Sequence, residues 1–360
     1  MFLNDLGKQL NGTDFGIQLG CLIISAIFFA DDLVVIGSSK AKLKKLIRII
    51  KKYFHEHRLT ISETKSKVIT HDASTGEMTF EGDDIDDISL DQVISFKYLG
   101  VPLNCSPYCM FKSFNDQVRQ RAQSYLYRVL ALVKTGPKRS SLAYTLWNQV
   151  ALPSILYGTE VLPITKETLD VIEMCQNTIG KFILQIPRSS ANVSSYIDAG
   201  FRPVWSVIAE RTLVYARKTM RNPLSSWTKI AMNECISMGE KNPYTKHLMS
   251  YKDKTGVFGM MTADKIKQRV KFAARKDTLN LLNKKKITTF AMSLPVTLKT
   301  WFRPKTWVSD SGISKIFAEF RGCNSGLGNR GPSPDGKKYK LCPLCIQTGQ
   351  VALNNEVIFI

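Results

Sequence analysis

The chain has 360 residues, of which 44% are hydrophobic and 22% are charged. This composition excludes an intrinsically disordered chain. The length is sufficient for two or three domains, each with its own core. The formal net charge is +20 and is uneven: residues 1–104 carry 12 Lys and Arg against 14 Asp and Glu, and residues 105–360 carry 38 against 16. Such a basic region favours nucleic acid as partner, an anionic membrane surface second, and a solvated surface without specific partner as the plain alternative.

The cysteines and the apolar stretches bear on the compartment. Eight cysteines are spread thinly along the chain, unlike the framework of a secreted disulfide-rich protein. No signal peptide is recognisable at Met1, and the apolar stretch Cys21–Ile36 is interrupted by Ser25 and by two aspartates, too often for a bilayer span. We therefore expect an intracellular protein, in the nucleus or the cytoplasm, without a membrane partner.

Residues 1–104 show mixed patterns of helix and strand. Phe2–Leu10 is typical of the end of a helix, and the apolar runs Cys21–Ala30 and Leu33–Ile36 predict a hairpin whose tight turn is Asp31-Asp32. Apolar residues at helical spacing predict a helix over 40–56, capped by Ser38 or Ser39. Its other face should be basic, through Lys42, Lys44, Lys45, Arg48, Lys51 and Lys52. Short strands are expected near Lys67–Thr70, Met78–Glu81 and Ser95–Leu99.

Residues 106–300 change to helical periodicity, so the whole chain is expected to belong to the α+β class. Gly136-Pro137 interrupts the first helical pattern, and Gly, Pro, Asn and Ser in residues 321–341 predict a flexible linker. Helices are expected over 118–132 and around Leu142–Leu152, Thr168–Gln185, Val204–Met220 and the strongly basic Ala263–Asn283.

Two adjacent acids at the tip of an apolar hairpin, Asp31 and Asp32, are the first candidate for chemistry. A sharp turn lets both carboxylates approach one site, and carboxylate oxygens are the ligands that Mg²⁺ prefers. Two Mg²⁺ ions about 4 Å apart can serve nucleotidyl transfer. Asp is also common in ordinary turns, so this pair alone leaves both interpretations open.

Three segments in order resemble the reverse transcriptases of LINE-type (non-LTR) retrotransposons. Phe29–Val34 resembles their Ala-Asp-Asp palm motif, Arg58–Lys67 their next motif with its lysine, and Phe96–Val101 their primer grip. The intervals also fit, with 34 residues from Asp31 to Lys65 and 33 from Lys65 to Tyr98. The resemblance continues more diffusely through Ile155–Glu160.

The resemblance implies a partial polymerase palm over residues 1–104 and a basic, helical thumb and post-thumb region over 105–320. It implies that Asp31 and Asp32 hold Mg²⁺, that Lys65 lies near the triphosphate of an incoming dNTP, and that Tyr98, Leu99 and Gly100 contact the primer. The implied partners are an RNA template and a DNA primer. For the neighbouring Phe96, we expect simple strand packing.

Parts of the family pattern are not found. Neither Asp5 nor Asp14 stands in the pattern of the family's first catalytic aspartate, so two of three expected carboxylates are present and we expect a truncated chain that does not polymerise alone. Cys342 and Cys345 resemble half of a zinc knuckle in residues 342–360, but Ile358 stands where the family has histidine, so no tight Zn²⁺ site is expected. Gly326–Gly331 spells a dinucleotide-binding pattern by chance, since prolines follow it.

Three functions therefore compete. The first is part of an RNA-directed DNA polymerase. The second is a nucleic-acid-binding module without catalysis, which would use the basic residues after position 104 and aromatics such as Tyr125, Tyr127 and Trp147, although Trp147 suits a helix core better. The third is a structural scaffold, for which no specific pattern speaks.

Overall fold

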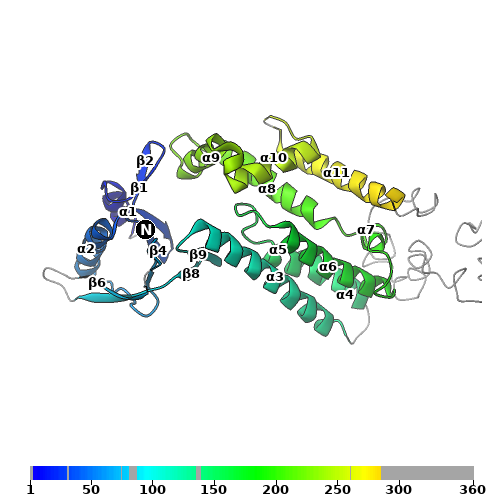
Figure 1. Ribbon diagram of the computed structural model, residues 1–360, viewed down its shortest axis with the longest axis horizontal. Coiled ribbons are helices and arrows are strands. Elements are labelled where there is room, and N and C mark those ends of the chain that lie inside the picture. The colour runs from blue at the N-terminus through cyan, green and yellow to red at the C-terminus, as the bar shows by residue number, and fades with distance from the viewer. Residues whose placement is uncertain are drawn as a thin grey trace, which may run out of the picture. The chain divides into compact units, whose positions relative to one another are not determined.

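A computed structural model of the chain describes residues 3–30, 32–73, 75–80, 87–134, 139–259 and 261–284 (Figure 1). These residues form helices and small sheets, so the predicted α+β class is confirmed. The chain divides into two compact units. The first contains residues 1–114 and 216–246, and the second contains 115–215 together with the residues from 247 onward. The sequence patterns do not predict that 216–246 belongs with the first unit.

The first unit contains all nine described strands, in four small sheets. Three of these sheets are antiparallel pairs, β1–β2, β3–β4 and β8–β9, and the fourth has the order β5-β7-β6. Within it β6 and β7 are antiparallel, whereas β5 and β7 are parallel over two residues. The strands are β1 (Ile17–Leu19), β2 (Leu22–Ile24), β3 (Ala26–Phe29), β4 (Asp32–Val35), β5 (Lys67–Val68), β6 (Gly76–Phe80), β7 (Ile88–Gln92), β8 (Ser95–Tyr98) and β9 (Val101–Asn104).

The predicted hairpin around the two aspartates forms, with two corrections. The apolar run Cys21–Ala30 is not one strand, because it breaks at the buried Ser25 into β2, which pairs with β1, and β3, which pairs with β4. The turn also lies one residue earlier than predicted. Ala30 adopts the left-handed conformation with φ of 54°, so β4 already starts at Asp32, which pairs with Phe29.

Two helices cover the core of the first unit. Helix α1 is Asn4–Asn11, and α2 is Lys40–Glu56, where the amphipathic pattern predicts it. The Ser39 side chain caps α2 by accepting a hydrogen bond from the backbone N–H of Lys42 at 3.2 Å. The buried core residues are Leu6, Leu10, Ala26, Leu46, Ile47, Ile50, Val68, Met78, Phe80 and Leu90.

Lys51 corrects the predicted basic face of α2. Its side chain is buried, 3% exposed, because it lies next to Ile47 and Ile50 on the face that packs against the sheet. The Nζ donates a hydrogen bond to the carbonyl oxygen of Phe80 at 3.1 Å, which satisfies part of the buried ammonium. The other cations of the predicted face remain on the outside of the helix or at its edge.

The rest of the described chain is helical, as its periodicity predicts. Trp147 is fully buried, as expected for a core residue, and its Nε1 donates to Oε1 of Gln176 at 3.3 Å. The helices α7, α9 and α10 are not predicted from the sequence. The elements are α3 (Pro107–Leu132), α4 (Arg139–Leu146), a π-helical turn (Trp147–Ala151), α5 (Leu152–Ile155), α6 (Lys166–Leu184), α7 (Val193–Ile197), α8 (Val204–Met220), α9 (Trp227–Ser237), a 3₁₀ turn (Gly239–Lys241), α10 (Pro243–Thr255) and α11 (Ala263–Lys284).

Several predictions fall outside the described residues, among them the break at Gly136-Pro137, the linker over 321–341 and the half-site of Cys342 and Cys345. In the part of the chain that the structure describes, no helix combines the length and the apolar character needed to cross a bilayer.

Candidate functional site

The β3–β4 hairpin carries the candidate acids of the first unit. Asp32 is the first residue of β4, its side chain is exposed, and it pairs across the hairpin with Phe29, which is 61% exposed. No Lys or Arg among the described residues forms an ion pair with Asp32. Its carboxylate therefore remains open to a ligand from solvent. Asp31, the second predicted acid, lies outside the described residues.

The base of this hairpin is fixed by Asn11, the last residue of α1. Its Oδ1 accepts hydrogen bonds from the backbone N–H groups of Ser25 at 2.8 Å and Ala26 at 3.0 Å. Its Nδ2 donates to the carbonyl oxygen of Ala26 at 3.1 Å. One amide thus satisfies three backbone groups at the start of β3 and joins that strand to α1. The sequence patterns do not predict this role of Asn11.

Close packing also supports the hairpin nearer its tip, at the pair Phe28–Leu33. Phe28 and Leu33 pack against the core that α1 and α2 cover. A Cβ on Gly7 would lie 3.2 Å from the Phe28 ring, so α1 approaches β3 closely where it has no side chain. The backbone of Ile36 also donates to the carbonyl oxygen of Ser25 at 2.8 Å, which extends the pairing past β4. The exposed tip therefore stands on a rigid base.

The β8–β9 hairpin forms over the predicted primer-grip segment. Tyr98 pairs with Val101, and the two residues between them, Leu99 and Gly100, have φ values of 46° and 83°. Positive φ at both positions is the pattern of a type I′ turn, whose twist suits a two-residue hairpin. Phe96 lies within β8, where it pairs with Leu103, as expected for a strand residue, and its side chain is 37% exposed.

Tyr98 and Asp32 connect the two hairpins. The pKa of the Tyr98 hydroxyl is raised above its ordinary value of 10.0, first by burial and then by the negative charge of Asp32. The Tyr98 oxygen is inaccessible to solvent, and no described group accepts a hydrogen bond from it or donates one to it. Residues that are 66 positions apart are therefore brought to one place by the fold of the first unit.

Lys65 does not join this pair. It lies in an exposed turn between α2 and β5, where its backbone N–H donates to the carbonyl oxygen of Ser62 at 3.2 Å. A second hydrogen bond, between the hydroxyls of Ser62 and Thr64 at 3.2 Å, shapes the same turn. Among the described residues, no hydrogen bond or ion pair links the Lys65 side chain to Asp32. Its ammonium group is accessible to an anion from solvent.

The described residues contain no cluster of three or more His, Cys, Asp or Glu side chains arranged to hold a metal ion. Since Asp31 is not described, this finding does not cover the complete Asp31-Asp32 pair.

Comparison with known families now bears on both hairpins. Residues 1–103 match the family described as reverse transcriptase (RNA-dependent DNA polymerase). The reverse transcriptase match contains Asp31, Asp32, Lys65, Tyr98 and both hairpins, and it ends one residue before β9 does. No curated protein matches the chain. Residues 1–103 are therefore similar in sequence to reverse transcriptase domains.

The reverse transcriptase match and the predicted site residues agree on the same segment. The sequence motifs identify Asp32 and Tyr98 separately, whereas their proximity appears only in the fold. Asn11 was missed because an asparagine before glycine in a polar stretch is typical of any loop. Its place directly after the amphipathic pattern of α1 is the only signal that could have indicated a structural role.

Proposed function

We propose that residues 1–104 are part of the palm of a reverse transcriptase of the LINE-type (non-LTR) class, and that residues 105–320 form its basic thumb and post-thumb region. The reaction is transfer of nucleotides from dNTPs to a DNA primer on an RNA template. The subtype rests on Phe29-Ala30-Asp31-Asp32 and on the intervals to Lys65 and Tyr98. The family match to residues 1–103 supports the reaction class.

The family match to residues 1–103, which contains both hairpins, is the observation that carries this proposal. A polymerase must hold the primer end beside the metal-binding acids, so the primer-contacting hairpin has to meet the acidic hairpin. The charge of Asp32 reaches the Tyr98 hydroxyl, which is buried and has no described hydrogen-bond partner. Tyr98, Leu99 and Gly100 would then position the primer against the acids, since the turn of the β8–β9 hairpin follows Tyr98 directly.

Asp31 and Asp32 are the residues that would hold Mg²⁺. The exposed Asp32 carboxylate has no cationic partner among the described residues and offers hard oxygen ligands, so it fits this metal. Bound Mg²⁺ would activate the attacking oxygen and stabilise the charge that develops on the leaving oxygen. The exposed Lys65 would attract the triphosphate of the dNTP.

Iron-directed cleavage tests the metal site and its neighbour together. Fe²⁺ in place of Mg²⁺, with ascorbate and peroxide, produces radicals that cut the main chain close to the bound ion. We expect cuts near residues 31–32 and near residue 98, and excess Mg²⁺ should suppress both. The double variant Asp31→Asn/Asp32→Asn should lose both cuts. The matched variant Asp83→Asn/Asp84→Asn removes another adjacent acid pair with the same loss of charge and should keep them.

Cuts in both variants, or none in the wild type, would contradict the proposed metal site. A primer-extension lane on an RNA–DNA primer-template belongs beside this assay. We expect steeply salt-dependent binding but no extension by the 360-residue chain, because two-metal catalysis requires a third carboxylate. Robust extension would overturn that expectation and would place the third acid within these 360 residues.

A further inference from the structure

Helix α11 in the second unit has two contrasting faces. One face is buried and apolar, and it includes Val270, which is fully inaccessible. The opposite face carries Lys265, Arg269, Phe272 and Lys276, all exposed. Because an α-helix turns about 100° per residue, these four lie within about 60° of one another around the helix axis. We call these four residues the α11 ridge. The buried residues are Ile266, Val270, Ala273, Ala274 and Thr278.

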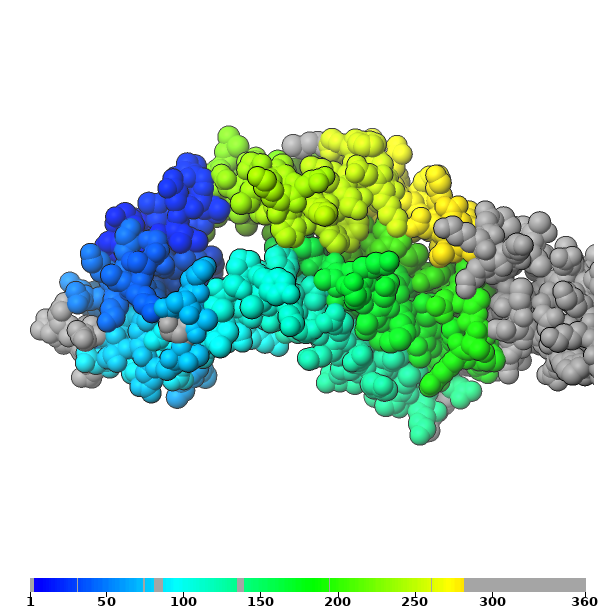
Figure 2. Space-filling model, viewed as in Figure 1, coloured from blue at the N-terminus to red at the C-terminus, as the bar shows by residue number. Residues whose placement is uncertain are grey.

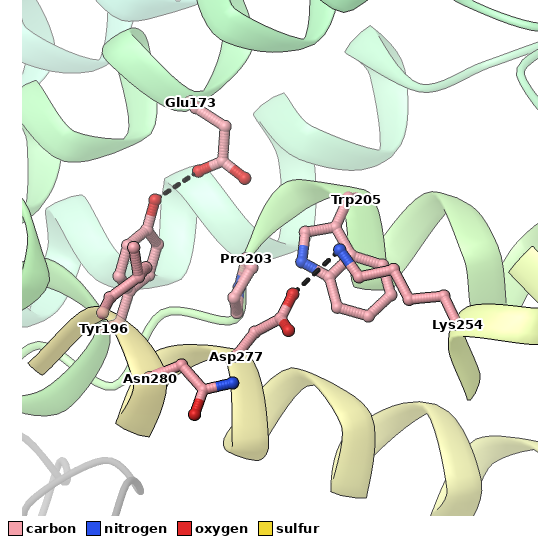
Figure 3. Close-up of a pocket in the computed structure, with 8 residues that line it drawn as sticks. Glu173, Tyr196, Pro203, Trp205, Lys254, Asp277 and Asn280 are labelled. Carbon is pink, nitrogen blue, oxygen red and sulfur yellow. Dashed lines mark hydrogen bonds and ion pairs between the residues drawn. The ribbon is translucent and has the colours of Figure 1, made fainter. Parts of the chain in front are cut away.

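The buried side of α11 is firmly attached within its unit. Asp277 forms an ion pair with Lys254 of α10 at 2.8 Å, and the Lys254 ammonium lies 3.6 Å from the centroid of the Trp205 ring (Figure 3). Leu279 lies seven residues after Phe272, and so on the same side of α11 as the ridge, and it packs against Val193 and Ile197 of α7. The ion pair of Asp277 and the buried face around Val270 fix the rotation of α11, so the ridge remains exposed.

Two aromatic rings are exposed at or near the ridge, one on α11 and one in the loop before it. Phe272 is 69% exposed and Phe258, in the loop before the helix, is 68% exposed. Both line a cavity of about 890 Å³ together with Lys265 and Arg269. The yellow surface of α11 is visible in Figure 2. Large exposed aromatics are costly in water, and rings that share a concave site with cations are a frequent means of ligand recognition. The remaining lining residues are Met261, Thr262 and Gln268.

The positive charge of this surface favours an anionic ligand. Helix α11 contains seven Lys and Arg and two Asp, and one of these acids, Asp277, is already paired with Lys254. Among the described residues, no acid forms an ion pair with Lys265 or Arg269. The start of the helix is capped by the Thr262 hydroxyl, which accepts from the backbone N–H of Lys265 at 3.3 Å. The two cations are therefore available to phosphates.

We propose that the α11 ridge and Phe258 form a binding site for single-stranded nucleic acid. Bases stack on Phe272 and Phe258, and Lys265 and Arg269 bind the phosphates between them, which is how single-strand binding proteins combine rings with cations. A membrane surface fits less well, because the single ring of the ridge, Phe272, lies between cations and no continuous apolar stripe is present on the ridge. The site lies outside residues 1–103 and needs no catalysis, so it stands or falls separately from the polymerase proposal.

Binding of short labelled oligonucleotides to the full 360-residue chain tests this site. The probes are single-stranded RNA and DNA of about eight nucleotides and equal sequence, in a salt series. Phe272→Ala should weaken binding about five-fold to a hundredfold, the range expected when one stacked base is lost, whereas Phe272→Trp should retain it. Equal loss for RNA and DNA indicates stacking and phosphate contacts, and a larger loss for RNA adds recognition of the 2′-hydroxyl. Either pattern supports the site.

A charge-matched pair of variants separates the ridge from general attraction to a basic protein. Lys265→Gln/Arg269→Gln should reduce the slope of log affinity against log salt by about 1.4, or about 0.7 per phosphate contact. Lys267→Gln/Lys271→Gln removes the same charge from exposed positions elsewhere on α11 and should change the slope much less. Equal effects of the two pairs, or unchanged binding by Phe272→Ala, would overturn the site. So would Phe272-dependent binding to phosphatidylserine vesicles without oligonucleotide binding.

Discussion

Two hairpins of the first unit, β3–β4 and β8–β9, have similar turns but differ in the contacts that support them. Both reverse through a two-residue turn with positive φ, at Ala30 in β3–β4 and at Leu99-Gly100 in β8–β9. The first begins at the fully buried Ala26, where Asn11 holds the backbone. In the second, no residue of either strand is buried. The fold therefore fixes the hairpin that carries Asp32 and leaves the hairpin that carries Tyr98 near the surface.

This difference matches the tasks that we propose for the two hairpins. Metal ligands must be held in fixed geometry, because small displacements are costly for catalysis. A surface that contacts a moving primer must instead remain accessible. Equivalent substitutions in the two hairpins should therefore have unequal effects.

The largest contrast is expected between Asn11→Ala and Asn104→Ala. Asn11→Ala leaves three backbone groups of Ser25 and Ala26 without partners and should lower the free energy of unfolding by about 3 kcal/mol. Asn104, at the end of β9, makes one hydrogen bond, from Nδ2 to the Ser113 hydroxyl at 3.1 Å, and its removal should cost about 1 kcal/mol. Urea denaturation of both variants measures this. Equal costs would show that the anchoring by Asn11 is unimportant.

A smaller contrast, with opposite signs, is expected at the two turns. Ala30 holds φ of 54°, which strains an L-residue, so Ala30→Gly should stabilise the protein by about 0.5 kcal/mol. Gly100 holds φ of 83°, so Gly100→Ala should destabilise it by about 1 kcal/mol. Thermal unfolding of the two variants should shift in opposite directions. A shift of both variants in the same direction would contradict the strain assigned to Ala30.

The smallest expected effect is the pH dependence that Tyr98 contributes. Its pKa is raised in the folded state, by burial and then by Asp32, so above about pH 10 the unfolded chain loses this proton first. Stability should therefore fall as the pH rises through the folded pKa. Tyr98→Phe should make this fall shallower, and Asp32→Asn should do so in part. Asp5→Asn, an exposed acid on α1, is the control. An effect of Asp5→Asn as large as that of Asp32→Asn would contradict the specific proximity of Tyr98 and Asp32.

The sequence predicts the local helices and strands of the first unit well, but it does not predict how they pack against one another. Helix α2 and the hairpins follow from periodicity and turn residues, which are local signals. The proximity of Tyr98 and Asp32 depends on how separate sheets pack, which no local pattern encodes. Lys51 was placed on the basic face because periodicity alone does not show that a lysine can reach a buried carbonyl such as that of Phe80.

The second unit shows the same limit. The long helices α6, α8 and α11 are predicted because their apolar positions repeat over several turns. The five-residue α7 offers too few turns for a periodic signal, yet its Val193 and Ile197 support α11. The exposure of Phe272 was likewise not predictable, because a phenylalanine within a helical pattern is usually counted with the core.

The anchoring of Asn11 also affects how the protein ages. An asparagine followed by glycine, as in Asn11-Gly12, is chemically unstable because the glycine nitrogen can attack the side-chain amide and release ammonia. In this fold the Gly12 N–H donates to the carbonyl oxygen of Lys8 at 2.9 Å, and the Asn11 amide is held by Ser25 and Ala26. The native state thus slows its own deamidation. Deamidation would leave a carboxylate facing the Ala26 carbonyl oxygen. Deamidation of the unfolded chain would therefore weaken the hairpin that bears Asp32 after the chain folds.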